Sequence, residues 1–226
     1  MVVDLLSRLD GDLLAACGCC FAGGTAISLQ LGEYRRSDDI DFVCASVEGY
    51  RTLRERVFDA GLAGLARGEL PVLREPRMDQ YGIRAVLGEA VAPVKFEIVR
   101  EARIALAAAP ERLAGVPLLS RVDLYAEKLL ANADRGLDAA TLHRDLIDLC
   151  VMVRRWGAIP AMAADKARAA YGHSIDRAFE RVAARLREQP AERQRCLEAL
   201  QAEADVAADV EAVLASASLA ALIAAD

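Results

Sequence analysis

Two aspartates separated by a single residue, Asp39 and Asp41, have the type and spacing needed for metal chemistry. They open an apolar run, 40–45, that is typical of a buried strand, and alternate residues of a strand point to the same face. Two neighbouring carboxylates repel each other unless a cation lies between them. Magnesium prefers one or two carboxylates together with phosphate oxygens of a substrate. The pair therefore predicts a divalent-metal site suited to phosphoryl or nucleotidyl transfer, with a solvated strand edge as the alternative.

A small-residue turn upstream favours the metal site over that alternative. Gly23 and Gly24 follow a short apolar segment, 16–22, that suits a buried strand, and Thr25 is a good N-cap for a helix over 26–31. Glycines allow the backbone to approach a phosphate closely, and the free amides at a helix N-terminus attract anions. Strand, turn and helix thus follow in the order that a phosphate-binding turn requires.

One set of residues in this stretch follows a known pattern: Gly23-Gly24-Thr25-Ala26, Leu29, Leu31-Gly32, Arg35 or Arg36, Ser37 and Asp39-Ile40-Asp41-Phe42. The pattern resembles the first motif of the nucleotidyltransferase (polymerase-beta-like) superfamily, and more closely that of the AbiEii/AbiGii-type abortive-infection toxin family. The resemblance implies a mixed-sheet catalytic lobe that binds a nucleoside triphosphate (NTP) with Mg²⁺ or Mn²⁺. It implies that Asp39 and Asp41 bind the metal and are catalytic. The residues implied to bind the nucleotide here are Gly23, Gly24, Thr25, Arg36 and Ser37.

A third carboxylate, Glu97, is a candidate metal ligand on a later strand. The superfamily that the first motif resembles usually supplies such a carboxylate. Lys95 and Glu97 share one face of the expected strand over 94–99, so Glu97 could meet the two aspartates across the sheet. A surface pair between Lys95 and Glu97 is the equal alternative.

The C-terminal half carries two further stretches with a family resemblance. Residues 121–131 resemble the third motif, whose lysine, here Lys128, contacts nucleotide phosphates, and residues 144–149 resemble the fourth, R-D-x-x-D-L. Lys128 lies next to the apolar stripe of its helix, so its stem could be buried while its ammonium group reaches a cleft. With the first motif present, we expect Lys128 to be a catalytic phosphate ligand and Asp145 to be a catalytic or orienting carboxylate that activates the attacking hydroxyl.

Helical spacing suggests a simpler account of the fourth motif. Arg144 could pair with Asp148 one turn later, leaving Asp148 to support its helix. A solvated helix face is the alternative to a functional role for these charges.

The pattern of elements predicts an α+β fold. An N-terminal nucleotidyltransferase-like mixed sheet with flanking helices, residues 1–115, precedes a C-terminal helical bundle, residues 116–226, that is expected to complete the active-site cleft. Two alternating runs, 70–77 and 81–87, are typical of a hairpin within the sheet.

Composition excludes several classes of protein. With 27% charged and 54% hydrophobic residues among 226, the chain is not of a disordered class, and no apolar run approaches the ~20 residues of a membrane helix. Acidic residues interrupt any secretory segment near the N-terminus, so a cytoplasmic location is expected. The six cysteines form no C-x-x-C pair and predict free thiols. A net charge of -6 disfavours wrapping of long nucleic acid but allows a local basic groove.

These observations lead to one functional prediction with two alternatives. The chain is expected to be a Mg²⁺-dependent nucleotidyltransferase that moves a nucleotide from an NTP to an acceptor hydroxyl, for example at a tRNA 3′ end. The resemblance implies the toxin of a type IV toxin-antitoxin system, with a cognate antitoxin acting indirectly. The alternatives are a non-catalytic or antitoxin-like module that binds a protein, and a nucleotidyltransferase acting on an antibiotic or metabolite.

Overall fold

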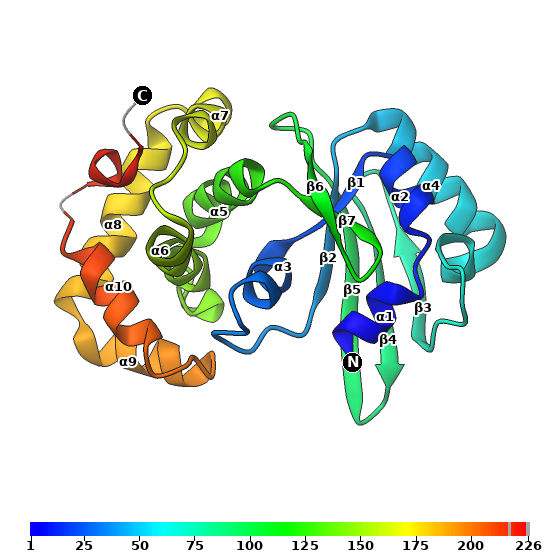
Figure 1. The fold of residues 1–226 in the computed structure, drawn as a ribbon, viewed down its shortest axis with the longest axis horizontal. Coiled ribbons are helices and arrows are strands. Elements are labelled where there is room, and N and C mark those ends of the chain that lie inside the picture. The colour runs from blue at the N-terminus through cyan, green and yellow to red at the C-terminus, as the bar shows by residue number, and fades with distance from the viewer. Residues whose placement is uncertain (217, 225–226) are drawn as a thin grey trace. The chain divides into compact units, whose positions relative to one another are not determined.

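A mixed β-sheet with flanking helices organises the N-terminal part of the chain (Figure 1). The computed structural model describes residues 1–216 and 218–224. Within these residues the sheet has seven strands in the order β3-β4-β5-β2-β1-β7-β6. The strands are β1 (Cys19–Ala22), β2 (Ile40–Cys44), β3 (Val72–Met78), β4 (Gly82–Glu89), β5 (Ala92–Arg100), β6 (Ala108–Leu113) and β7 (Val116–Leu119). The predicted α+β fold is confirmed.

The helices precede, interrupt and follow the strands. Those among the strands are α1 (Val2–Ser7), α2 (Gly11–Ala16), α3 (Gly23–Gln30) and α4 (Val47–Ala60). Those after the sheet are α5 (Arg121–Arg135), α6 (Arg144–Trp156), α7 (Ala161–Tyr171), α8 (Ser174–Glu188), α9 (Pro190–Ala199) and α10 (Val206–Leu214). No helix among the described residues is both long and apolar enough to cross a membrane.

Contacts divide the chain into two compact units. The first unit comprises Met1–Ala26 and Asp38–Ser120, and the second comprises Ile27–Ser37 and Arg121–Asp226. The second unit therefore includes a short stretch from the N-terminal half, which the sequence did not indicate. The predicted lobe boundary after residue 115 falls in the hairpin of β6 and β7, and residues 217, 225 and 226 of the predicted C-terminal lobe lie outside the described residues.

Three phenylalanines form the core on one face of the central strands. Phe21 on β1, Phe42 on β2 and Phe96 on β5 are buried, with ring centroids 5.6 Å and 6.0 Å apart in succession. Each buried ring stabilises the fold by about 1.5–3 kcal/mol. Because side chains alternate along a strand, Asp41 and Glu97 lie on the opposite face. The core therefore fixes which way the predicted metal ligands point.

The sequence predicted most strands but not the start of α3. The hairpin expected over 70–87 is present as β3 and β4, and the expected strand over 94–99 is β5. Thr25 was expected to be an N-cap, but α3 begins directly after β1 at Gly23, so Thr25 lies inside the first helical turn. A glycine with positive φ allows this abrupt change from strand to helix.

The second unit is a bundle in which α5 is central. Helix α5 packs on α6, α7 and α8, and α6 packs on α10. The Tyr125 ring on α5 contacts Trp156 edge-on with centroids 6.1 Å apart, and its hydroxyl donates to the Gly157 carbonyl at 2.8 Å. These contacts fix α5 and α6, which carry Lys128 and Asp145.

Candidate active site

The two predicted metal ligands lie at the start of β2. Asp41 is the second residue of β2 and pairs in register with Ala22 on β1 and with Glu97 on β5. Asp39 directly precedes the strand. Both aspartates are partly exposed, whereas Ile40 between them is buried. The two carboxylates are therefore accessible to solvent at the start of β2, where the buried side chain of Ile40 fixes the backbone between them.

The backbone at Gly23 approaches the Asp41 carboxylate more closely than a larger residue would permit. Gly23 has a φ of +72°. A Cβ atom at this position would lie 2.8 Å from Asp41 Oδ2 and 3.0 Å from Asp41 Cβ. Since α3 begins at Gly23, the amides of Gly23, Gly24 and Thr25 belong to its first helical turn. The glycine turn and the carboxylate thus form one local structure.

Glu97 lies beside Asp41 but is held by two cations of the same sheet. Arg84 Nε donates to Glu97 Oε1 at 2.7 Å, and Lys95 Nζ lies 3.0 Å from Oε2. Burial would lower the pKa of Lys95, but the hydrogen bond and charge of Glu97 and the charges of Asp41 and Asp39 outweigh it and raise that pKa. Among the described residues, no group of three or more His, Cys, Asp or Glu side chains is arranged to hold a metal ion. The role of Glu97 as a third ligand stays a prediction.

The surroundings of Asp41 fit a divalent cation that is bound together with a phosphate. Carboxylates are the hard oxygen donors that Mg²⁺ prefers, and Mg²⁺ completes its coordination with water and substrate phosphate oxygens, so Asp39 and Asp41 suffice as protein ligands. The space next to Asp41 that a Cβ at residue 23 would fill is left open by glycine. The residues present therefore suit a two-carboxylate site beside a phosphate-binding turn.

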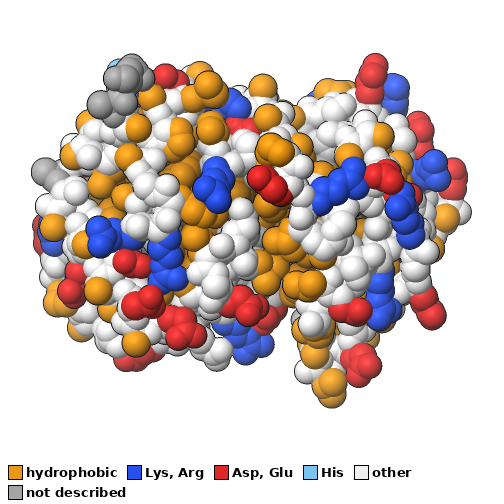
Figure 2. Space-filling model, in the orientation of Figure 1, with side chains coloured by type: hydrophobic (Ala, Val, Ile, Leu, Met, Phe, Trp, Pro, Cys, Tyr) orange, Lys and Arg blue, Asp and Glu red, His pale blue; other side chains and the backbone are white. Residues whose placement is uncertain are grey.

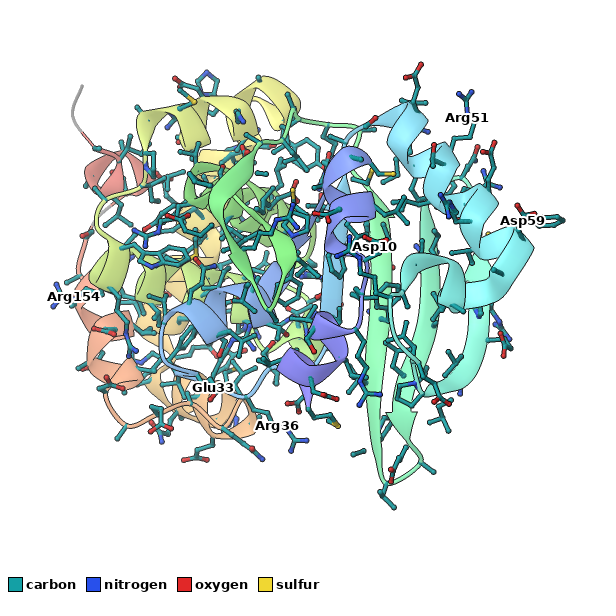
Figure 3. The ribbon with its side chains drawn as sticks, turned by 45° about the vertical axis from the view of Figure 1, so that its right-hand side comes forward. Asp10, Glu33, Arg36, Arg51, Asp59 and Arg154 are labelled. Carbon is teal, nitrogen blue, oxygen red and sulfur yellow. The ribbon has the colours of Figure 1, made fainter. Side chains whose placement is uncertain are left out.

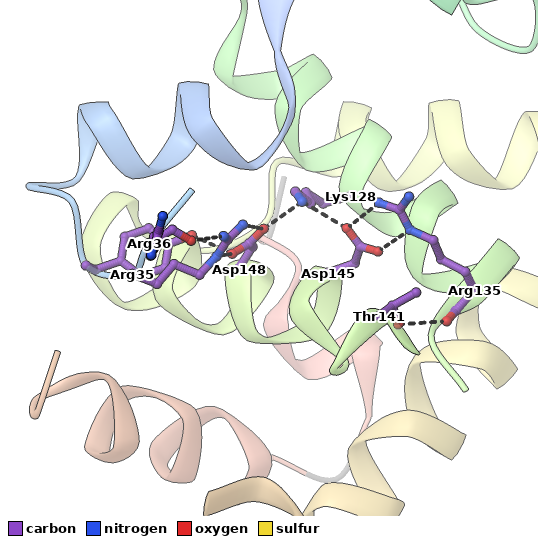
Figure 4. A network of polar contacts seen from close by, with 8 residues as sticks. Arg35, Arg36, Lys128, Arg135, Thr141, Asp145 and Asp148 are labelled. Atoms are coloured by element: carbon purple, nitrogen blue, oxygen red, sulfur yellow. Dashed lines mark hydrogen bonds and ion pairs between the residues drawn. The ribbon is translucent and has the colours of Figure 1, made fainter. Parts of the chain in front are cut away.

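The second unit contains a charge cluster of Arg35, Lys128, Arg135, Asp145 and Asp148 (Figure 4). Lys128 is only 5% exposed, and its Nζ lies 2.9 Å from Asp145 Oδ1 and 2.6 Å from Asp148 Oδ2. An ammonium group has three protons, so two of them serve these carboxylates. Three cations against two carboxylates leave an excess of one positive charge, which favours an anion near the cluster.

Asp145 lies in the first turn of α6 and is held in its ionised form. Arg135 donates from Nε to Oδ2 at 2.7 Å and from its terminal nitrogen to Oδ1 at 3.1 Å. Burial would raise the pKa of Asp145, but the Lys128 charge and the Arg135 hydrogen bonds outweigh it and hold that pKa well below its usual value. A carboxylate with so low a pKa is a weak base. The geometry therefore favours an orienting role for Asp145 over proton abstraction.

Asp148 is fully buried and receives hydrogen bonds on both oxygens. Arg35 donates from Nε to Oδ1 at 2.6 Å and from its terminal nitrogen to Oδ2 at 2.9 Å, and the Tyr34 hydroxyl donates to Oδ1 at 2.6 Å. Burial would raise the pKa of Asp148, but the charges of Arg35 and Lys128 lower it. The sequence suggested Arg144 as the partner of Asp148; the structure instead assigns Arg35, Lys128 and Tyr34.

Sequence reasoning missed the roles of Tyr34 and Arg35. The motif allowed either Arg35 or Arg36, and Arg36 was the residue expected to bind the nucleotide. Arg35 is buried, whereas Arg36 is exposed on the outer side of its segment (Figure 3). The only signal that could have separated the two arginines is the neighbouring Tyr34, whose large apolar ring suggests local burial. Ser37, the other predicted nucleotide ligand here, is partly exposed.

Comparison with protein families decides the family of this chain. Residues 4–219 match the family described as nucleotidyl transferase AbiEii toxin, type IV toxin-antitoxin system. The chain belongs to this AbiEii family. The resemblance drawn from the first motif is thereby confirmed, and the AbiEii match also spans the segments that carry Lys128 and Asp145.

Solved structures are similar to the chain in fold. A candidate nucleotidyltransferase from H. pylori is 15% identical, with a TM-score of 0.51, and the match covers 95% of this chain and 90% of that chain. JHP933 from Helicobacter pylori is 14% identical, with a TM-score of 0.50, covering 95% of this chain and 88% of that chain. At such low identity these likenesses concern the fold alone. No curated protein matches the chain by sequence.

Proposed function

We propose that this AbiEii-family chain transfers a nucleotide from an NTP to an acceptor hydroxyl with release of pyrophosphate, using a divalent cation held by Asp39 and Asp41. The observation that carries the proposal is the close approach of the Gly23 backbone to the Asp41 carboxylate. This close approach supports the proposal because it places the turn proposed to bind phosphate beside a proposed metal ligand. Family membership supports nucleotidyl transfer as the reaction.

The residues of the first unit have separate tasks in this proposal. The amides of Gly23, Gly24 and Thr25 bind phosphate oxygens through the N-terminal turn of α3, where the helix dipole favours negative charge. Asp39 and Asp41 bind Mg²⁺ or Mn²⁺, with Glu97 as the proposed third carboxylate. When bound, the cation neutralises phosphate charge and polarises the phosphoryl group. Catalysis then rests on positioning and charge stabilisation.

Lys128 and Asp145 have proposed roles in the same reaction. Lys128 retains one ammonium proton beyond those that serve Asp145 and Asp148, and the cluster around it has an excess positive charge. Both features support Lys128 as a ligand of a nucleotide phosphate. The bonds of Arg135 and Lys128 support Asp145 as the residue that orients Lys128.

We propose the 3′ end of a tRNA as the acceptor and the cytoplasm as the location, as expected for a type IV toxin. In Figure 2 acidic and basic side chains are interspersed over the visible face. With a net charge of -6, the chain suits an acceptor that is held at its end rather than along its length. A cognate antitoxin that acts indirectly is part of the same proposal.

The test is transfer of labelled nucleotide by the purified protein onto several acceptors. Each of the four α-³²P-labelled NTPs is incubated with Mg²⁺ and deacylated tRNA, a total protein fraction or a set of aminoglycosides. The proposal expects label on tRNA that a 3′-specific nuclease removes. Label only on small molecules would support the small-molecule alternative. The absence of both label transfer and nucleotide binding would contradict the enzyme proposal.

A further inference from the structure

The connection between the glycine turn and the metal aspartates belongs to the second unit. Residues 27–37 join α3 to β2, and they are grouped with the helical bundle, whereas Asp39 and Asp41 are grouped with the sheet. We call residues 31–37 the linking segment. Contacts that fix residues 31–37 therefore also limit the positions open to the backbone directly before Asp39 and Asp41.

Hydrogen bonds to its backbone hold the linking segment within the second unit. The bonds run from Glu203 N to Tyr34 O at 2.8 Å, from Ser28 Oγ to Arg35 O at 2.9 Å and from Arg36 N to Leu200 O at 3.0 Å. Arg155 also donates to the Leu31 carbonyl at 3.1 Å. The linking segment begins directly after α3 and contains no helix or strand, but these hydrogen bonds fix its backbone.

A buried charge pair anchors the centre of this segment. Arg35 is 4% exposed and Asp148 is 0% exposed, and they form two hydrogen bonds of 2.6 Å and 2.9 Å. Tyr34 adds a hydrogen bond to the same carboxylate. A planar guanidinium that binds both oxygens of a carboxylate fixes orientation as well as distance. The pair of Arg35 and Asp148 therefore restricts the orientation of the segment more than a lysine–carboxylate ion pair would.

We propose that Arg35 and Asp148 are positioning residues for the metal ligands Asp39 and Asp41. Asp39 follows Arg35 by four residues, and four residues span at most about 14 Å. A fixed Arg35 therefore limits where the chain can enter β2. The Arg35 guanidinium donates to Asp148 and to the Arg36 carbonyl, so Arg35 acts through Asp39 and Asp41 rather than on substrate. This inference rests on the proposed metal site.

The chain offers a matched control pair. Lys166 on α7 forms a partly buried ion pair with Asp123 on α5, within the same unit and outside the linking segment in sequence. Replacing Lys166 by glutamine breaks this charge pair without changing any of residues 31–37. Arg35→Lys keeps the positive charge but loses the bidentate hydrogen bonds to Asp148. Asp148→Asn keeps the shape of the side chain but loses its negative charge.

The first measurement is amide hydrogen exchange by NMR on the protein without ligands. Arg35→Lys and Asp148→Asn should speed exchange about tenfold at the amides of residues 38–41, whereas Lys166→Gln should leave these amides unchanged. Faster exchange at residues 34–36 alone, with residues 38–41 unchanged, would overturn the inference. Arg35→Lys is the variant that keeps this test decisive if Asp148→Asn does not fold.

The second measurement is Mn²⁺ binding by electron paramagnetic resonance, which needs no catalytic activity. Arg35→Lys should weaken Mn²⁺ binding about tenfold, and Lys166→Gln should not change it. Equal Mn²⁺ affinity in wild type and Arg35→Lys would overturn the inference. Failure of the wild type to bind Mn²⁺ would instead contradict the proposed metal site, and hydrogen exchange at residues 38–41 would then decide the positioning claim alone.

Discussion

Replacing Gly23 by alanine should weaken metal binding as well as the fold. The new Cβ would lie 2.8 Å from Asp41 Oδ2, closer than real Cβ contacts, so the carboxylate must move by a few tenths of an ångström. The φ of +72° at this position also strains any residue with a Cβ, which costs roughly 1–2 kcal/mol. We therefore expect a loss of about 1–2 kcal/mol in the free energy of unfolding and about a tenfold loss in Mn²⁺ affinity.

Gly115→Ala separates the two effects. Gly115 has a φ of +86°, a Cβ there would have no neighbour within 4 Å, and the residue lies in the first unit outside the linking segment. The variant should lose a similar amount of stability in urea denaturation while binding Mn²⁺ like wild type. If Gly23→Ala and Gly115→Ala have equal Mn²⁺ affinities, the close approach of the Gly23 backbone does not position Asp41, and the reasoning fails.

Three further outcomes follow from the charges of the two units. Lys128→Met leaves Asp145 and Asp148 buried without their shared cation, so urea denaturation should show a loss of about 3–5 kcal/mol; a loss below about 1 kcal/mol would show that the cluster is not tightly coupled. The folded-state pKa values of Asp145 and Asp148 are lowered, so their stabilisation is present above the unfolded value of about 3.9 and is lost as the pH falls further. Denaturation between pH 7 and pH 3 should therefore show falling stability at the acid end, with a flatter curve in Asp148→Asn. Glu97→Gln should lower Mn²⁺ affinity, but by less than Asp41→Asn, because Arg84 and Lys95 also hold the Glu97 carboxylate; an Mn²⁺ affinity equal to that of wild type would contradict Glu97 as the third carboxylate.

Local spacing rules predicted which faces of the central strands are buried, because alternation along a strand depends only on residues that are close in sequence. The alternation of Asp41 with Phe42 and of Glu97 with Phe96 was enough to assign one polar and one buried face. The sequence did not predict the ion pair between Glu97 and Arg84. Arg84 lies on β4, and its pairing with Glu97 depends on the register between β4 and β5.

The same rules failed for the second unit because its decisive contact joins distant residues. Arg35 and Asp148 are 113 positions apart, and Arg35 lies in a segment without helical or strand periodicity. Helical spacing offered Arg144 as the partner of Asp148, which is a sound expectation for an isolated helix. Burial changes the outcome, since a fully buried carboxylate is costly unless it is paired, and Arg35 and Lys128 are the cations that reach Asp148.

The most direct test of the central claim is metal-dependent nucleotide transfer in wild type and Asp41→Asn. Labelled NTP is incubated with tRNA and a graded series of Mg²⁺ concentrations, and circular dichroism confirms that both proteins are folded. We predict transfer by wild type that EDTA abolishes and Mg²⁺ restores, and a loss of at least about a hundredfold in Asp41→Asn. Transfer by a folded Asp41→Asn at the wild-type rate and Mg²⁺ dependence would contradict the assignment of the active site to β2.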